Sequence, residues 1–136
     1  MESQEAIPVR LRVAEAITDE IQEMFDEITR RAYEIFQRRG GNSTLDLEDW
    51  LTAERQVVDK PSFRIDETSN RIIVTVYISN LNVAELQILV TPDAMLIHGQ
   101  RGNGSKELFR VVQFPRRIDA TKAEAQYGDG CLVLTA

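Results

Sequence analysis

Apolar and polar residues alternate at a period of two through most of the second half of the chain. Because successive side chains of a strand point to opposite faces, this alternation predicts strands. Strands are predicted at 63–66, 71–79, 84–90, 94–101, 108–114 and 131–135, and a further one leads from Ala125 into the turn at 128–130. With turn signals between them, seven short strands predict a two-sheet antiparallel sandwich.

The first third of the chain has a different apolar period. From Val9 to about Arg39, apolar residues recur at steps of three and four. This spacing predicts an amphipathic helix, or two helices that meet near Thr18. Residues 1–8 show no pattern and are expected to form a frayed tail.

A second, shorter helix is predicted at 47–58. A turn between it and the first helix would give a helical hairpin over about residues 10–58. In such a hairpin we expect Trp50 to be buried against Tyr33 and Phe36.

Two elements near the end of the chain carry a family resemblance. Arg110 precedes the strand-ending Pro115 by five positions, and residues 125–132 read A-x-x-x-D-G-x-L. In this order the elements resemble the α-crystallin domain of small heat-shock proteins, with Asp129 in place of the usual Asn. The resemblance covers about residues 61–135.

The pattern and the resemblance together predict the fold class and the domains. The protein is predicted to be mainly β, with an immunoglobulin-like antiparallel β-sandwich of the α-crystallin type at 61–136. An N-terminal helical region at 1–60, containing the α-helical hairpin, is predicted to precede it.

The helical region resembles a second family. Residues 31–40 read R-A-Y-x-I-F-x-x-R-G, and residues 49–54 read D-W-x-x-A-E. This pattern is similar to that of a small bacterial module of unknown function over about residues 28–58. The resemblance implies a bacterial source and brings no activity with it.

The net charge of −6 is confined to the N-terminal part. Residues 1–60 hold 8 Lys and Arg against 14 Asp and Glu, whereas residues 61–136 hold 8 of each. Nucleic-acid binding depends on a basic surface, so we do not expect it. The sequence has no run of about 18 apolar residues and no signal-peptide pattern, so no membrane contact is expected and a cytoplasmic location is predicted.

No set of residues predicts catalysis, a cofactor or a metal site. His98 is the one histidine and Cys131 the one cysteine. A lone cysteine can form neither an internal disulfide nor a cysteine-based metal site, and Cys131 is interpreted as a small buried hydrophobic residue. His98 is interpreted as a surface or hydrogen-bonded residue, and we expect no enzyme activity.

The resemblance to small heat-shock proteins implies an ATP-independent chaperone, a holdase that binds unfolding client proteins through apolar surface and sheet edges. In that family a groove between two edge strands accepts an Ile-x-Ile tail, and the preceding helical segment contacts clients. The residues that match the groove are Leu86, Ile88, Val90, Leu132 and Leu134. The matching helical client surface consists of Ile21, Met24, Phe25 and Ile28. For the groove residues, the alternative interpretation is an ordinary position in the sandwich core.

Two further residues are assigned structural or interface roles. Arg110 lies on an otherwise apolar strand. Burial of an arginine without a partner destabilises the folded state by several kcal/mol, so a carboxylate partner is expected. In the family the matching arginine supports the sheet and subunit contacts. Trp50 is expected to hold the helical hairpin together. The alternative function is an adaptor or co-chaperone-like interaction module without holdase activity.

Two departures from the family concern assembly. The chain stops at Ala136 without an Ile-x-Ile tail, and six residues separate Arg101 from Leu108, too few for the swapped strand of bacterial relatives. We therefore expect a monomer or a homodimer and no large oligomer.

Overall fold

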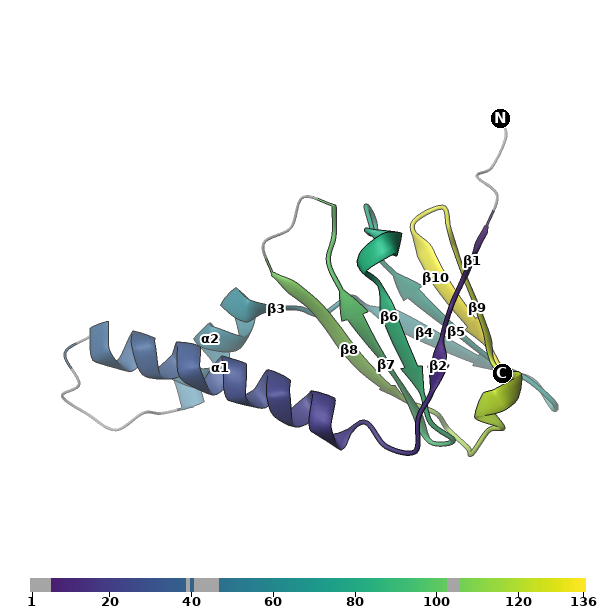
Figure 1. Cartoon of the computed structure of the whole chain (residues 1–136), viewed down its shortest axis with the longest axis horizontal. Coiled ribbons are helices and arrows are strands. Elements are labelled where there is room, and N and C mark those ends of the chain that lie inside the picture. The colour runs from purple at the N-terminus through teal and green to yellow at the C-terminus, as the bar shows by residue number, and fades with distance from the viewer. Residues whose placement is uncertain (1–5, 39, 41–46, 103–105) are drawn as a thin grey trace.

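Two five-stranded sheets pack face to face, and two helices lie at one side of them (Figure 1). The computed structural model describes residues 6–38, 40, 47–102 and 106–136. The strands are β1 (Ile7–Val9), β2 (Arg12–Val13), β3 (Val58–Asp59), β4 (Phe63–Glu67), β5 (Ile72–Tyr77), β6 (Gln87–Val90), β7 (Ala94–Gly99), β8 (Glu107–Gln113), β9 (Glu124–Gly128) and β10 (Cys131–Thr135). Sheet A has the order β1-β9-β10-β5-β4, and sheet B has the order β2-β6-β7-β8-β3.

The predicted fold class is confirmed, because the chain is mainly β and a helical segment precedes most of the sandwich. All pairings in sheet A are antiparallel, whereas the short outer strands β2 and β3 of sheet B pair in parallel. Residues Val83–Glu85 form a 3-10 turn, so the strand predicted at 84–90 begins at Gln87. A second 3-10 turn, Ala120–Lys122, precedes β9.

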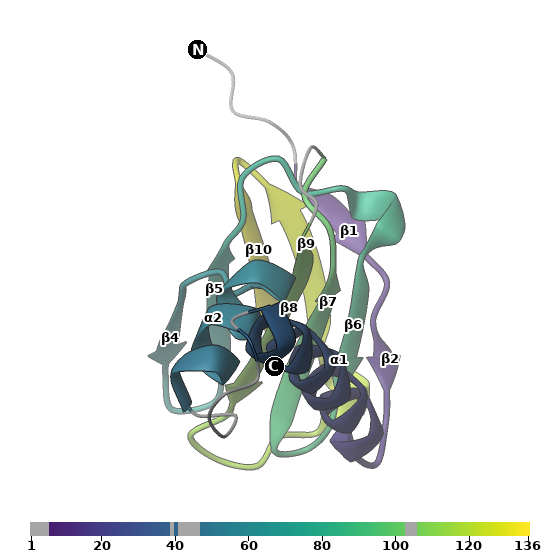
Figure 2. The same cartoon turned by 90° about the vertical axis from the view of Figure 1, so that its left-hand side faces the viewer.

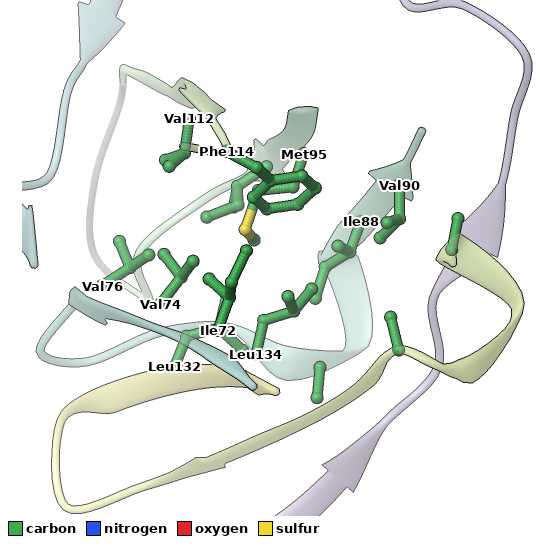
Figure 3. Close-up of a cluster of buried hydrophobic side chains, with 14 of the residues drawn as sticks. Ile72, Val74, Val76, Ile88, Val90, Met95, Val112, Phe114, Leu132 and Leu134 are labelled. Atoms are coloured by element: carbon green, nitrogen blue, oxygen red, sulfur yellow. The ribbon is translucent and has the colours of Figure 1, made fainter. Parts of the chain in front are cut away.

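The main core lies between the inward faces of the two sheets (Figure 3). In β5, Ile72, Val74 and Val76 are fully buried, while the residues that alternate with them are partly exposed. The period-two pattern of the sequence therefore reports directly on which side chains fill the core. The other buried members are Ile78, Ile88, Val90, Met95, Ile97, Leu108, Val112, Phe114, Ala120, Ala123, Ala125, Leu132 and Leu134.

The turn between β9 and β10 sets the register of the last hairpin. Asp129 and Gly130 both have positive φ, at 52° and 76°. Two consecutive positive φ values give the turn whose twist matches that of antiparallel strands, and Asp-Gly is a preferred pair for it. Cys131 consequently lies opposite Gly128, and Leu132 points into the core.

Residues 7–13 form a strap across the sandwich, where the sequence predicted a tail followed by a helix. β1 pairs with β9 at the edge of sheet A, and β2 pairs with β6 at the edge of sheet B. Val9 and Leu11 pack against the main core. Pro8 is compatible with β1 because β1 is an edge strand, where proline is found in sheets.

The first helix, α1 (Thr18–Arg38), begins at the position where the sequence allowed a second helix start, and not near residue 10. Residues 12–13, which precede α1, are held in strand geometry because β2 pairs with β6 of sheet B. Gly40, with φ of 97°, follows the helix and donates its N–H to the Gln37 carbonyl at 3.1 Å, as glycine does at many helix ends. The division of the chain at residue 60 stays a prediction.

The second helix, α2 (Leu47–Val57), runs crosswise to α1 (Figure 1). The aromatic contacts of the two helices differ from those expected. Trp50 pairs with the ring of Phe25, with centroids 5.7 Å apart, whereas Tyr33 and Phe36 pair with each other at 5.8 Å. In the part of the chain that the structure describes, no helix combines the length and apolar composition that crossing a membrane requires.

Candidate functional site: a groove between the helices and sheet B

An open groove of about 330 Å³ lies where α1 and α2 meet the outer face of sheet B. Figure 2 shows α1 lying in front of the strands of this sheet. The lining residues come from both helices, from the segment after α2 and from β8: Ile21, Met24, Phe25, Ile28, Trp50, Glu54, Val58, Lys60, Phe109, Arg110 and Val111. We call this site the helix–sheet groove. Its volume falls at the lower end of the range for ligand pockets.

The floor of the groove is held by a small core of its own. Met24, Ile28 and Ala32 are spaced four residues apart, so they share one face of α1 and are buried there. They pack with Ala53 of α2 and with Val58 of β3. Ala32 and Ala53 are fully buried, and their small side chains allow the two helices to approach closely.

The rim of the groove remains apolar and accessible. The Ile21 side chain is 39% exposed and that of Phe25 is 50% exposed, while Met24 and Ile28 beneath them are buried. The structure therefore brings all four residues of the predicted helical client surface to one site, two as floor and two as rim. Client binding at this site stays a prediction.

Two cationic side chains line the groove. Lys60 Nζ lies 2.8 Å from Glu54 Oε2. Arg110 is half-buried, and its guanidinium carbon lies 4.7 Å from the ring centroid of Phe63. In the described part of the chain this aromatic ring takes the place of the carboxylate partner that the sequence predicted. A cation over a ring face is attracted by the ring quadrupole, and Arg110 thereby connects β8 with β4 across the two sheets.

An acidic contact joins α1 to sheet B beside the groove. Partial burial raises the pKa of Glu27, and the hydrogen bond and negative charge of Glu107 raise it further, while Arg30 and His98 act in the opposite direction. His98 Nε2 lies 3.7 Å from Glu107 Oε2. The protonated form of Glu27 is therefore favoured where its side chain contacts Glu107.

The residues of the predicted sandwich groove lie in the core. Ile88, Val90, Leu132 and Leu134 are at most 2% exposed, and Leu86 is partly buried against them. The prediction took β10 to be an edge strand, but the order of sheet A places β10 between β9 and β5. The alternative interpretation of these residues, as core positions, describes them in this structure.

The strap occupies the two strand edges beside those residues. β9 and β6 each have one side paired within their sheet and the other paired with the strap. A shallow hollow of about 350 Å³ runs along the strap and β6, lined by Arg10, Leu11, Arg12, Leu86, Gln87, Ile88 and Leu89. Binding of a foreign strand at this edge would require the strap to leave.

Sequence reasoning missed two contributors to these sites. Phe109 and Val111 of β8 line the helix–sheet groove, and Val9 and Leu11 attach the strap. The first pair could have been found because β8 is apolar on both faces. Such a strand is expected to have other elements packed against both of its faces. The signal for the second was the alternation of Ile7, Val9, Leu11 and Val13 at a period of two.

Cys131 and His98, the one cysteine and the one histidine, do not line the groove. Cys131 is a free cysteine and is partly exposed, whereas the sequence predicted burial. His98 contacts the Phe109 ring edge-on, with centroids 6.0 Å apart. Among the described residues, no group of three or more His, Cys, Asp and Glu side chains is arranged to hold a metal ion.

A known family matches the part of the chain that forms most of the groove. Residues 23–58 match a family described as "Protein of unknown function (DUF2934)". The match includes most of α1, all of α2 and the start of β3, which is less than half of the chain, and the description assigns no activity. No curated protein matches the sequence.

Several solved structures of heat-shock proteins are similar to this chain. HSP18.5 from E. histolytica is 12% identical with a TM-score of 0.51, and the match covers 57% of this chain and 86% of that one. Heat shock protein 16.0 from Schizosaccharomyces pombe is 22% identical with a TM-score of 0.49, covering 57% of this chain and 65% of that one, which is less than two thirds of its length. The Del-C4 mutant of hsp14.1 from Sulfolobus solfatataricus P2 is 16% identical with a TM-score of 0.48, covering 76% and 93%.

At these identities the likeness concerns the fold alone, and the match to HSP18.5 is the one that carries the comparison. The two sheets, with antiparallel pairing of all strands except β2 and β3, correspond to the sandwich that the resemblance implied. The sandwich of this chain has the α-crystallin-type fold of small heat-shock proteins.

Proposed function

We propose that this protein is an ATP-independent holdase of the small heat-shock protein class and that unfolding proteins bind in its helix–sheet groove. The observation that carries the proposal is the exposed apolar rim of Ile21 and Phe25 above a buried apolar floor. The α-crystallin-type fold supports the class, and the groove supplies a surface that needs no nucleotide and no catalytic group.

The strength of such binding follows from the area of apolar contact. Burial of apolar surface contributes about 25 cal/mol per Å². An unfolding chain that covers the rim and enters the groove gains a contact that depends on apolar area more than on sequence. Weak binding of many unrelated chains is the behaviour that a holdase requires.

The strap makes the helix–sheet groove the primary surface in this proposal. A client strand that adds to β6 or β9 must first displace the strap, whereas the groove is open in the structure. We therefore assign the five residues of the predicted sandwich groove at most a secondary role in client binding, one that requires displacement of the strap. These residues are Leu86, Ile88, Val90, Leu132 and Leu134. A homodimer, a cytoplasmic location and a bacterial source belong to the same proposal.

The test is suppression of aggregation. Light scattering of several unrelated heat-labile proteins is followed with and without this protein, at near-stoichiometric ratios and without ATP. We expect suppression by the native chain and at least a several-fold loss of it in the double variant Ile21→Ser/Phe25→Ser. Point variants are needed because deletion of the N-terminal region would also remove the strap from both sheets.

Tyr77→Ser is the matched control. Tyr77 is 42% exposed, a value close to that of Phe25, but it lies on β5 of sheet A, away from the groove. The control should keep full suppression. If the native chain suppresses nothing at several-fold excess, the holdase proposal fails, and capture of a single dominant partner would then support the adaptor.

The tryptophan provides a second readout. Trp50 is the one tryptophan of the chain and lines the groove beside Phe25. With a client protein that lacks tryptophan, its fluorescence should change on binding. Suppression without any change in Trp50 fluorescence would place the clients at another surface.

A further inference from the structure

β4 is the longest of the outermost strands of the two sheets in the part of the chain that the structure describes. β4 pairs with β5 on one side, and the order of sheet A ends with it. The other outer strands, β1, β2 and β3, have three, two and two residues against five in β4. Figure 2 shows β4 at the outer margin of the molecule. An unpaired edge of this length is a template for another strand.

The hydrogen bonds to β5 determine which groups of β4 point outward. The Ser62 carbonyl accepts from the Tyr77 N–H at 2.9 Å, and the Thr68 N–H donates to the Arg71 carbonyl at 2.8 Å. In an antiparallel ladder bonded pairs alternate, so even-numbered residues of β4 direct their backbone groups to β5. The N–H and C=O groups of Phe63, Ile65 and Glu67 therefore face the open edge.

The side chains of β4 form a pattern that is complementary to itself. Arg64 and Asp66 flank Ile65, and Arg64 Nε lies 3.0 Å from Asp66 Oδ2 within the chain. Both side chains are well exposed, at 66% and 49%, so this ion pair contributes little to the fold and its groups can pair elsewhere. If a second β4 runs antiparallel with Ile65 on the two-fold axis, each Arg64 lies opposite Asp66 of the second copy.

The same register satisfies the outward backbone groups. Ile65 exchanges both bonds with Ile65 of the second copy, and Phe63 exchanges both with Glu67 of the second copy. Arg64 and Asp66 then form the pairs without mutual backbone bonds, in which opposite side chains are closest. A two-fold axis through Arg64 or Asp66 would place like charges opposite each other, which destabilises the pairing.

We propose that two copies of this chain associate through β4, in antiparallel register centred on Ile65, so that the two A sheets become continuous. The two-fold arrangement is closed, because each β4 edge is used by the other. The interface does not depend on the proposed holdase function, and it leaves the helix–sheet groove lining, apart from the neighbouring Arg110–Phe63 contact, out of the pairing.

Sedimentation equilibrium of the full chain over the micromolar range tests the proposal. The mass should rise from 15.5 kDa towards twice that value with concentration. Arg64→Asp and Asp66→Arg each replace two attractive cross-strand pairs by repulsive ones, so each variant alone should dimerise about tenfold more weakly or not at all. Mixing the two variants should restore the dimer, because aspartates at 64 and 66 of one chain then face arginines of the other.

The mixing experiment separates contacts between chains from contacts within one chain, since mixing cannot repair an intrachain pair. Arg117→Asp is the matched control: Arg117 is 75% exposed, lies 3.8 Å from Asp93 and is far from β4 in the sequence. It should dimerise as the native chain does. A native chain that stays monomeric throughout, or a dimer that survives both single variants unchanged, would overturn the proposal.

Discussion

The sandwich and the two helices differ in how far their apolar side chains are buried. The sandwich gathers 16 buried residues into one cluster, whereas the cluster beneath the helices has five. Among the described residues, eight large apolar side chains are exposed, and five of these are on the two helices: Ile21, Phe25, Tyr33, Leu47 and Leu51. The helices thus present apolar surface that the sandwich hides.

This difference separates stability from binding. The strands bury their inward faces against each other, so the main core contains no residue of α1 or α2. The helices have a narrow buried face and take part of their burial from Phe109 of sheet B. Helices in proteins owe most of their stability to such tertiary contacts. We infer that changes in the sandwich act mainly on folding, and changes on the helices act mainly on binding.

The largest expected effect comes from the sandwich core. Leu132→Ala removes a fully buried side chain and should lower the free energy of unfolding by about 2–5 kcal/mol in urea denaturation followed by circular dichroism. Met24→Ala, beneath the helices, should cost about 2 kcal/mol, because the adjacent open groove lets the site relax. Equal losses, together with equal loss of amide protection in β5, would show that the two regions fold as one unit.

A smaller effect is expected at the strap, which lies between the two regions. Leu11→Ala removes a half-buried side chain that packs on the core and should cost about 1–2 kcal/mol. The matched variant Ile7→Ala, where the side chain is 53% exposed, should change stability by less than about 0.5 kcal/mol. Hydrogen exchange of β6 and β9 should be faster in Leu11→Ala. If exchange there is unchanged, the strap does not protect these edges.

The smallest effect concerns the contact of α1 with sheet B. The pKa of Glu27 is raised in the folded state, so its stabilising contribution is complete below the ordinary carboxyl pKa and is lost as pH rises through the higher folded value. Glu27→Gln does not titrate, and its stability relative to the native chain should therefore increase from pH 4 to pH 7. Thermal melts at both pH values measure this, and a relative decrease would show that Arg30 and His98 dominate over Glu107.

The sandwich could be predicted because its strands follow the period-two rule closely. β5 and β10 have β-branched or apolar residues at each inward position, and Asp129-Gly130 marks the last turn. The strap could not be placed by the same rule, since Val13 and Ile17 also fit a helical spacing and β2 has two residues. Its geometry depends on partners in β6 and β9 that are distant in the sequence.

The helix–sheet groove could be predicted in part. The spacing of Ile21, Met24, Phe25 and Ile28 marks one face of a helix, but it does not show which of them are floor and which are rim. That distinction depends on the crossing of α2, which places Trp50 beside Phe25 and not beside Tyr33. The partner of Arg110 could not be predicted from its place in an apolar strand, because the guanidinium lies over the Phe63 ring and not beside a carboxylate.

The strap belongs to the same chain as β6 and β9, and this affects how well a separate peptide can compete with it for these two strands. A segment tethered to its own binding site has an effective concentration of about millimolar, so a separate peptide of equal affinity must approach that concentration to compete for β6 and β9. Four residues connect Val13 of the strap to Thr18 of α1. This linker spans at most about 3.6 Å per residue, so a strap that has left the sheets stays within a short distance of β6 while α1 keeps its place.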